Sequence, residues 1–485
     1  MIYDNVVVGT GLSALGCILG LIKNNKKVLC IDASNELEDL GKTDDKDVIF
    51  CNQGLPLRKI RNKKIKNKLF DPVEIVDNHF YGGLSNIWGG NALRPFANEF
   101  DEWPLSYDLL KPYFDKCETI MNISHFDDKF SKKFEIEEEK FNKSKKLLFS
   151  DFIKNFLLND KTENKDFIYG LARLTLEENS QISENYFFGC KDENIFNSKN
   201  EIKRLVDEKK IELKSNMVLE KVNFDDDKLK LIFKNDKVNI ILTKKLFLGT
   251  GPINTPKIIL NSLKQEKKAI VKESQPFFIP CFYTGRDFNN NKKHHTLSQA
   301  QIVFNSKNNN DHNTYYEVKY DFNLIDSIIK IKYGFLYYLI PNFLKKRLFV
   351  ITGFINSNES SFEGEIKDNN DNLQIIKKEK MLQYSRKKIL DQLKTLGKAF
   401  SFISIKPLLK FGSFGRGFHL GGSLPMKKTS LKKDDLFTNP NGEFSAMKNL
   451  FIIDSSNFTN IPASGFSLTI MANAFRIADT SCSND

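Results

Sequence analysis

Apolar residues near the start of the chain follow the pattern of a strand, a helix and a second strand. Tyr3–Val8 is a short run rich in β-branched residues, and Leu12–Lys23 has the length and apolar pattern of a buried helix. After the polar turn Asn24–Lys27, Val28–Asp32 is a second short apolar run. Short apolar runs bounded by turn residues are typical of buried strands. The pattern therefore predicts a βαβ unit of about 30 residues.

The remaining elements are predicted from the same patterns. Helices are expected at 130–165, 201–208, 377–402 and 467–478. Strands are expected at 211–218, 220–224, 229–233, 238–242, 245–248 and 450–454. The third and fourth of these strands are predicted to form an antiparallel hairpin with its turn at 234–237. Residues 275–371 are rich in strand-forming residues and polar loops, and the chain shows no internal repeat.

The composition is that of a globular protein with more than one domain. A chain of 485 residues corresponds to about two or three domains. Apolar residues make up 40% and charged residues 28%, so a large core can be buried. The formal net charge of +12 favours anionic partners and is spread through Lys/Asn-rich stretches such as 62–68 and 289–293. A solvated basic surface is the simplest interpretation, and an anionic substrate and a membrane surface are the alternatives.

The cysteines and the N-terminal apolar run indicate in which cellular compartment the protein is expected. Seven cysteines lie scattered at 17, 30, 51, 117, 190, 281 and 482 without a C-x-x-C pair, which favours neither a metal site nor a disulfide framework. A reducing compartment is the simpler inference. The apolar run 6–22 follows Asp4 without a basic n-region or a small-residue cleavage site, so it does not resemble a signal peptide. No stretch of about 18 apolar residues predicts a transmembrane helix, and we expect a cytoplasmic protein.

The turn between the first strand and the first helix carries the motif G-x-G-x-x-A, which is Gly9-Thr10-Gly11-Leu12-Ser13-Ala14. Gly9 permits the tight turn, Gly11 lets the backbone approach a pyrophosphate, and Ala14 keeps the helix close to the sheet. The helix N-terminus adds free N–H groups. Asp32, 21 residues after Gly11, stands where a carboxylate accepts hydrogen bonds from ribose hydroxyls. The motif predicts a dinucleotide site, leaves FAD and NAD open, and has a glycine-rich turn in an unrelated α/β fold as its alternative.

A second glycine-rich segment, Tyr81–Gly90, has the sequence Y-G-G-L-S-N-I-W-G-G. It is followed by Asp101-Glu102-Trp103 and by Tyr107–Phe114. Its glycines would let backbone approach a flat cofactor and supply N–H donors. Taken alone, a glycine-rich surface loop with one packed tryptophan is the simpler interpretation.

Two further segments have their own sequence signatures. Leu248–Ile259 is L-G-T-G-P-I-N-T-P-K-I-I, a buried strand that ends in small residues before Pro256, which suits a helix start. Phe418-His419-Leu420-Gly421-Gly422-Ser423 is followed by N-L-F-I-I-D-S-S at 449–456 and by L-T-I-M-A-N-A at 468–474.

In this order, the four segments resemble the glucose–methanol–choline (GMC) family of FAD-dependent oxidoreductases. They are similar to the family's G-x-G-x-x-G/A, G-G-x-S-x-x-W, G-A-x-x-T-P (with Pro252 for Ala) and H-x-G-G to T-I-M-A elements. The resemblance implies an α/β fold with a Rossmann-like FAD-binding domain and a discontinuous α+β second domain that carries a sheet. The FAD domain is expected at 1–120, 166–270 and 412–485, and the substrate-binding or cap domain at 121–165 and 271–411. The resemblance is weak from about 120 to 165 and from 270 to 410.

The resemblance also implies the residues of the flavin site. The segment at 81–90 would run beside the flavin ring, Val218 would offer backbone to the adenine, and Asp454 would meet the ribityl–pyrophosphate region. The last helix would point its N-terminus at the flavin. The cofactor-binding residues expected from the motif and the resemblance together are Gly9, Gly11, Leu12, Ser13, Ala14, Asp32, Gly83, Ser85, Trp88, Gly89, Gly90, Asn91, Val218, Thr250, Gly251, Asp454, Ser455, Phe466, Ser467 and Leu468.

In the resembled family an alcohol is oxidised to a carbonyl. A histidine near the flavin takes the hydroxyl proton, and hydride passes to N5 of the isoalloxazine. Hydride leaves an alkoxide far more readily than an alcohol, so a base with a pKa near the working pH helps. His419 is the expected base, with a structural histidine that holds its loop as the alternative. The expected function is therefore oxidation of the CH–OH group of a sugar or other alcohol by a dehydrogenase or oxidase, with no nucleic-acid partner.

The sequence departs from the family at the second catalytic position. The family has His or Asn four residues before the Thr of T-I-M-A, and this chain has Gly465. Ser464 and, from the other domain, His294, His295 and Gln299 are weak substitutes. The departure motivates an alternative function, an FAD-containing lyase or isomerase, or a binding protein with a degenerate site.

Two other departures concern the cofactor and metals. Ile87 stands where some relatives attach FAD through a histidine, so the FAD is expected to be non-covalent. Cys190 stands alone where several bacterial relatives have a Cys-rich stretch, so no metal is assigned.

Residues 321–354 form a basic, aromatic stretch. Aromatic residues at 333, 335, 337, 338, 343 and 349 alternate with Lys330, Lys332, Lys345, Lys346 and Arg347, and Pro341 interrupts the run. Such a stretch can lie in a bilayer interface, which would place the protein at the inner face of the membrane and suggest a lipid-linked substrate. A core helix with a solvated basic face is the alternative.

Overall fold

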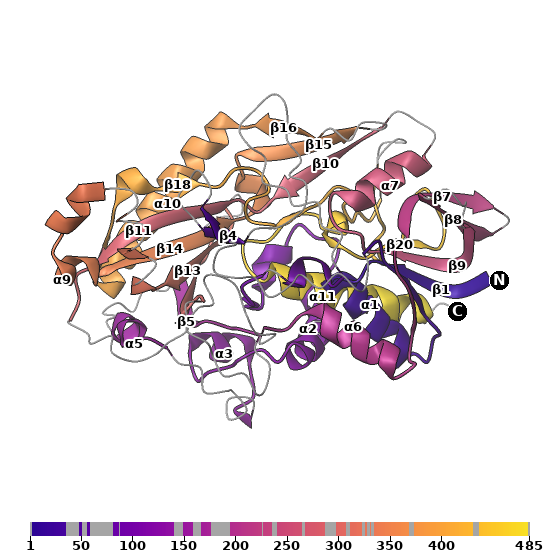
Figure 1. The fold of residues 1–485 in the computed structure, drawn as a ribbon, viewed down its shortest axis with the longest axis horizontal. Coiled ribbons are helices and arrows are strands. Elements are labelled where there is room, and N and C mark those ends of the chain that lie inside the picture. The colour runs from indigo at the N-terminus through magenta and orange to yellow at the C-terminus, as the bar shows by residue number, and fades with distance from the viewer. Residues whose placement is uncertain are drawn as a thin grey trace.

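The structure, a computed structural model, describes most of the chain (Figure 1). The described residues are 2–34, 48–50, 56–58, 81–86, 88–139, 149–158, 166–175, 195–225, 227–234, 240–263, 267–286, 297–306, 311–322, 325–326, 330, 334–367, 373–429 and 436–483. The predictions for Ile87, Cys190, His294 and His295, and for the stretches 62–68 and 289–293, fall outside these residues.

The N-terminal strand lies inside a seven-stranded sheet, on the right in Figure 1. The strands that pair in parallel are β6 (Glu212–Lys214), β2 (Leu29–Ile31), β1 (Ile2–Val8), β9 (Ile240–Leu248) and β20 (Leu450–Ile452). The antiparallel strands β8 (Lys228–Lys234) and β7 (Val218–Asp225) extend the sheet beyond β9. The carboxyl ends of β1, β2 and β9 therefore meet at one edge, where open α/β sheets bind ligands.

Alternate residues of β1 enter two different cores. Val7 packs with α1 (Leu12–Lys23) and α11 (Phe466–Cys482), whereas Val6 and Val8 pack with the β7–β8 hairpin and α7 (Asn254–Ser262). Because successive side chains of a strand point to opposite faces, a strand covered on both faces must be apolar throughout. This explains the continuous apolar run that predicted the strand.

A second, antiparallel sheet occupies the left of Figure 1. Its strands in order are β17 (Phe402–Ser404), β11 (Pro276–Tyr283), β14 (Leu348–Ile355), β13 (Thr314–Lys319), β12 (Ala300–Phe304) and β5 (Phe167–Leu171), with β18 (Lys410–Phe411) beside β11. The helices α5 (Asp151–Leu158) and α10 (Glu379–Phe400) bury Phe152, Phe156 and Leu393 in the core of this sheet. The sheet's opposite face is left for the polar side chains described below.

A four-stranded antiparallel sheet brings a C-terminal loop beside the other two. Its strands in order are β16 (Leu373–Lys377), β15 (Phe362–Lys367), β10 (Lys268–Glu273) and β19 (Leu420–Gly421). The other described strands and α-helices are β3 (Val48–Phe50), β4 (Pro56–Arg58), α2 (Tyr107–Ile120), α3 (Lys129–Phe134), α6 (Ser198–Asp207) and α9 (Asn342–Lys345). In the described residues, no helix combines the length and hydropathy that crossing a bilayer requires.

Most predicted elements are present, and three are corrected. The strands expected at 238–242 and 245–248 are one strand, β9, because its first residues pair with β8 and its later ones with β1 across the polar middle. The helix expected at 130–165 is divided into α3 and α5, since Glu135 adopts a φ of +55° and ends α3. The strand expected at 211–218 ends at Lys214.

One strand lies in a different sheet from the one the predicted domain boundaries imply. The sequence predicts that 166–270 belongs to the FAD domain, yet β5 pairs with β12 of the antiparallel sheet from Phe167 to Leu171. The pairing joins residues more than a hundred positions apart, which local sequence patterns do not encode.

Candidate cofactor and catalytic site

A cavity of about 800 Å³ opens between the carboxyl edge of the first sheet and the polar face of the antiparallel sheet. Its volume is at the upper end of the range of about 300–1,000 Å³ for ligand pockets. Seven chain segments line it, at 8–13, 32–33, 83–93, 217–220, 249–261, 415–420 and 454–470, together with residues from β8, β11, β13, β14 and the loop before β12. One continuous surface therefore joins the glycine motif to the C-terminal histidine loop.

The β1–α1 turn has the geometry that the glycine motif requires. The Gly9 amide donates to Ile31 O at 2.8 Å, and Gly9 has a φ of +111°. A Cβ at Gly9 would lie 2.4 Å from Gly249 O, so no larger residue fits this crossover. A Cβ at Gly11 would meet nothing within 4 Å, because this residue faces the open cavity.

Three helices begin at the cavity without a side-chain cap. They are α1 after Gly11, α7 after Ile253 and α11 after Gly465, and none has an acidic residue in its first turn. The first N–H groups of a helix have no partner within the helix and carry a partial positive charge. Uncapped N-termini that converge on one cavity are suited to phosphate groups.

Two carboxylates at strand ends lie on the cavity wall. Asp32 accepts a hydrogen bond from Thr10 Oγ1 at 2.6 Å and one from the Ser34 amide at 2.8 Å. Asp454 accepts bonds from the Gly251 amide at 2.8 Å and from Thr255 Oγ1. Burial raises the pKa of Asp454, although these donors oppose the shift. Each carboxylate thus ties its strand end to a neighbouring glycine turn.

The segment at 81–91 is bonded to the glycine motif. The Gly82 amide donates to Thr10 Oγ1 at 2.9 Å, and Ser85 Oγ donates to Gly82 O at 2.6 Å. Trp88 lines the cavity, while its indole N–H donates to Phe196 O at 2.8 Å. The tryptophan therefore both faces the cavity and anchors the segment to the chain at 196.

His419 lies on a loop fixed by backbone contacts. Its carbonyl accepts from the Ser274 amide at 3.0 Å, and Ser455 Oγ donates to Leu420 O at 2.6 Å. The residue before it, Phe418, adopts a φ of +56°. These contacts place the histidine loop directly beside the segment that carries Asp454.

The imidazole of His419 lies between two aromatic rings. Its centroid is 4.3 Å from that of Phe354 at 25° and 4.5 Å from that of Phe466 at 34°. Its Nδ1 is buried without a hydrogen-bond partner among the described residues. Burial lowers its pKa to about 4, and the negative charge of Glu317 partly opposes that shift. The ring is therefore neutral at neutral pH, and in this environment it is a weaker base than free imidazole.

A polar group on β13 faces the histidine loop across the cavity. Glu317 accepts bonds from Asn91 Nδ2 at 2.5 Å and Thr352 Oγ1 at 3.2 Å, and Lys319 Nζ lies 2.9 Å from it. Because side chains alternate along a strand, Tyr315 points to the same face, and its ring is stacked on Phe354. Sequence reasoning missed this group, and the alternation in T-Y-Y-E-V-K at 314–319 is the signal that could have found it.

Packing explains why residue 465 is a glycine. Gly465 has a φ of +66°, and a Cβ there would lie 2.5 Å from Pro95 Cδ and 2.6 Å from Leu93 O. Its neighbour Ser464 is buried and donates to Glu99 Oε2 at 2.7 Å, away from the cavity lining. Gln299, the other described candidate, is also buried outside the lining.

We expect that replacing Gly465 with asparagine lowers the free energy of unfolding by about 1–3 kcal/mol, the usual cost of an overpacked site. Urea unfolding of the purified variant measures the change. Gly334→Asn is the matched control, because Gly334 also has a positive φ, +52°, but open space around it. Equal stability of Gly465→Asn and the wild type would show that the position tolerates a side chain.

The cavity brings together most of the predicted site residues. Gly9, Gly11, Asp32, His419 and Asp454 line it, as do most of the others. The remaining predicted residues on the lining are Leu12, Ser13, Gly83, Ser85, Trp88, Gly89, Asn91, Val218, Thr250, Gly251, Ser455, Phe466 and Ser467. The predicted residues that do not line it are Ala14, Gly90 and Leu468. Ala14 and Leu468 are fully buried in the helices α1 and α11 that begin at the cavity, so any effect on a ligand is indirect.

The described residues contain no cluster of three or more His, Cys, Asp or Glu side chains arranged to hold a metal. Of the cysteines in the described ranges, Cys17, Cys30, Cys117 and Cys281 are buried thiols, and burial raises the pKa of each. A buried thiol with a raised pKa is chemically inert.

Comparisons with known proteins identify the fold. No protein-family model and no curated protein sequence matches the chain. The crystal structure of pyridoxine 4-oxidase from Mesorbium loti matches it with a TM-score of 0.60, over 99% of this chain and 99% of that one, at 11% sequence identity. At this identity the likeness shows the fold alone. It confirms the predicted fold class, an α/β protein with a Rossmann-like domain and a second domain that contains a sheet.

Proposed function

We propose that this chain is an FAD-dependent oxidoreductase that oxidises a CH–OH group of a sugar or other alcohol to a carbonyl. The proposal is carried by one observation, a single cavity lined both by a glycine crossover of the nucleotide-binding type and by the imidazole of His419. The resemblance of four segments to the GMC family and the fold shared with an oxidase support it.

The residues on the cavity wall fit a non-covalent FAD. The turn at Gly9 and the uncapped start of α1 would hold the pyrophosphate, Asp32 the ribose, and Val218 the adenine. The uncapped start of α11 would face the flavin. When bound, the flavin supplies the two-electron acceptor chemistry that no side chain has.

His419 is suited to take the proton of the substrate hydroxyl. Oxidation of CH–OH to a carbonyl removes one proton and one hydride, and an imidazole that is neutral at working pH accepts the proton. The rings of Phe354 and Phe466 hold the imidazole in one plane and exclude water from its two faces. A base whose orientation is already fixed loses little entropy when the substrate arrives.

Glu317 would contact the substrate in place of the His or Asn that the resembled family has at the position of Gly465. Asn91, Thr352 and Lys319 fix its carboxylate, and a carboxylate has further acceptor sites for a substrate hydroxyl. Lys319 compensates its charge, so the pair is suited to a neutral, hydroxyl-bearing molecule. Because Gly465 is required by packing, its lack of a side chain does not itself favour a lyase or an isomerase.

We expect that Glu317→Gln lowers kcat/KM about 10- to 100-fold, the effect of losing one charged hydrogen bond. It should also move the acid limb of the pH profile to lower pH. A base must be neutral, so kcat/KM falls as pH drops through the pKa of His419, and removal of the Glu317 charge lowers that pKa further. Steady-state kinetics across pH measures both effects, and an acid limb that shifts upward or stays in place would contradict the assignment.

Anaerobic mixing with a panel of alcohols and sugars tests the proposed function itself. The purified protein is expected to be yellow, and at least one of the alcohols should bleach the visible absorption of its flavin. A flavin that every alcohol leaves oxidised would count against alcohol oxidation and in favour of a non-oxidative role.

A further inference from the structure

The most exposed large apolar side chains in the described part of the chain share one end of the molecule. They are Leu158, Phe335, Tyr338, Leu339, Phe343 and Ile403, which are between 62% and 82% exposed. We refer to these six residues as the apolar end. Four of them fall within nine positions of the sequence, on the 3₁₀ helix η5 (Gly334–Leu339) and on α9.

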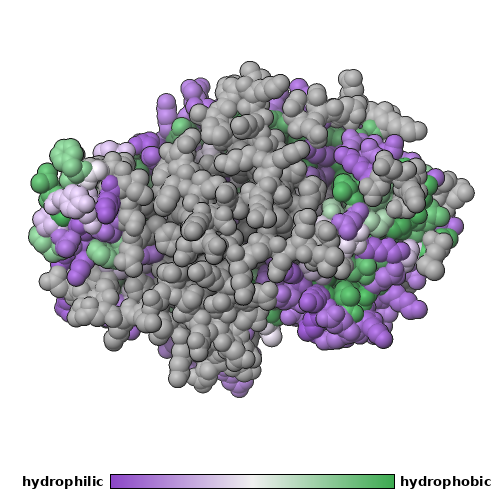
Figure 2. Space-filling view, in the orientation of Figure 1, coloured by the Kyte–Doolittle hydropathy of each residue, from purple (hydrophilic) through white to green (hydrophobic). Residues whose placement is uncertain are grey.

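Strand register places the apolar end at one edge of the antiparallel sheet. Ile403 pairs with Phe282 of β11, and Phe282 pairs with Leu348, which follows α9 closely in the chain. The helix α5, which ends at Leu158, packs its Phe156 ring on Phe349 and Phe402 at the same edge. Figure 1 shows α9 at the left-hand tip, and Figure 2 shows hydrophobic side chains exposed on that tip.

The stretch of chain that carries η5 and α9 is positively charged. Residues 327–358 include five Lys or Arg residues and no Asp or Glu. Lys330 and Lys346 are exposed. The nearest preceding acid in the described residues, Asp326, accepts a bond from the Tyr337 hydroxyl at 2.7 Å and lies 3.5 Å from the buried Lys345 Nζ. Within this stretch, the exposed charges of the described residues are therefore cationic.

We propose that the apolar end docks on the surface of an anionic phospholipid bilayer. Phe335, Leu339 and Phe343 would enter the acyl-chain boundary, Tyr338 would lie at headgroup level, and Lys330 and Lys346 would face the lipid phosphates. Exposed aromatic and leucine side chains beside lysines are the features of interfacial anchors, whereas monomeric soluble proteins rarely expose apolar clusters of this kind. The sequence left a core helix with a solvated basic face as the alternative for this stretch. The exposed apolar side chains do not fit that alternative, because a core helix would bury them.

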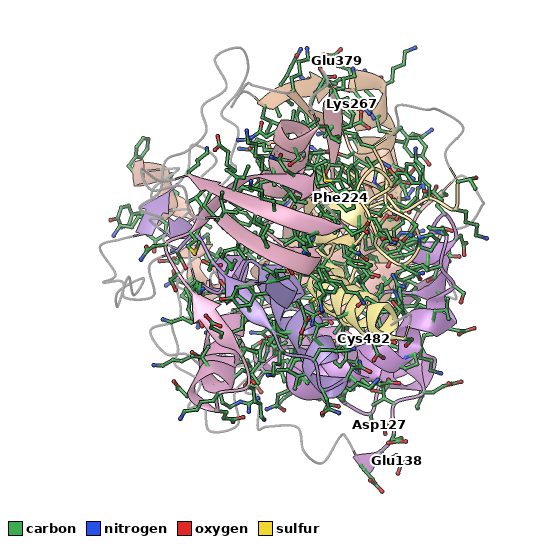
Figure 3. All side chains as sticks on the ribbon, turned by 90° about the vertical axis from the view of Figure 1, so that its right-hand side faces the viewer. Asp127, Glu138, Phe224, Lys267, Glu379 and Cys482 are labelled. Atoms are coloured by element: carbon green, nitrogen blue, oxygen red, sulfur yellow. The ribbon has the colours of Figure 1, made fainter. Side chains whose placement is uncertain are left out.

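Co-sedimentation of the full chain with lipid vesicles tests the proposal. The protein should bind vesicles that contain phosphatidylglycerol more tightly than vesicles of phosphatidylcholine alone, and added salt should weaken the binding. The triple variant Phe335→Ser/Leu339→Ser/Phe343→Ser should bind at least tenfold more weakly. The matched control is Phe224→Ser/Ile240→Ser, at exposed apolar positions (48% and 46%) of the opposite end, where Figure 3 labels Phe224. This control should bind as the wild type does.

Other outcomes would overturn the proposal. Equal vesicle binding by the triple variant and the wild type would contradict it, as would a wild type that binds no vesicle. Sedimentation velocity without lipid identifies the competing occupant: a dimer that the triple variant abolishes would assign the apolar end to a second copy of the chain. Unchanged thermal unfolding shows that the variants are folded, and the result does not depend on whether the chain binds a flavin.

Discussion

Replacing His419 with alanine is expected to lower kcat for alcohol oxidation by about 10²–10⁴-fold, the usual contribution of a positioned general base. The imidazole is the one ring nitrogen base on the described lining of the cavity, and it is neutral at neutral pH because burial lowers its pKa to about 4. The variant should still bind flavin, since the glycine motif and the uncapped helices lie on other segments.

Stopped-flow measurement of flavin reduction by the alcohol separates the chemical step from cofactor binding. His312→Ala is the matched control, because His312 is also a partly buried histidine but does not line the cavity. The control should keep wild-type reduction rates. If His419→Ala reduces its flavin at the wild-type rate, the imidazole holds the loop and takes no proton.

Replacing Gly11 with valine is expected to abolish FAD uptake while the protein stays folded. Gly11 has an extended backbone, with φ of −72° and ψ of −174°, which any residue adopts, and its Cβ would point into open cavity. The new side chain would therefore fill the space at the start of α1 where a pyrophosphate approaches. Gly9→Ala should behave differently and destabilise the fold by about 1–3 kcal/mol or more, because its Cβ would collide with Gly249 O.

Flavin titration and urea unfolding distinguish the two glycine variants. The prediction for Gly11→Val is a normal unfolding midpoint in the absence of FAD together with a loss of FAD binding. Stoichiometric FAD binding by Gly11→Val would show that the pyrophosphate does not lie at this helix.

Local signals predicted the half of the molecule around the first sheet well. The bounds of α1 agree with the predicted helix, because its apolar run, its glycine start and its polar end at Asn24 all lie within adjacent residues. Short-range rules also located Asp32, and the family resemblance located Asp454; both residues follow buried strands at the carboxyl edge of the sheet. In these segments propensity, pattern and fold agree, which is typical of minimally frustrated sequences.

The half around the antiparallel sheet could not be predicted, because the order of its strands depends on long-range pairing. The alternation at 314–319 indicates that Glu317 shares a face with Tyr315, but it does not encode the register between β13 and β14 that sets Glu317 opposite Thr352. Asn91 was expected at the cofactor, yet its side chain bonds both Glu317 and Gln301 and so connects the two halves. The exposure of Phe335 and Phe343 was likewise hidden, since an aromatic run fits a core as well as a surface.

A structure determined with FAD bound tests the central claim most directly. The account predicts one flavin per chain, with its pyrophosphate at the start of α1 and a nitrogen of His419 within reach of the substrate position beside the ring. A protein that takes up no FAD, or a bound flavin whose ring lies away from the pocket formed by His419, Phe354 and Phe466, would contradict it.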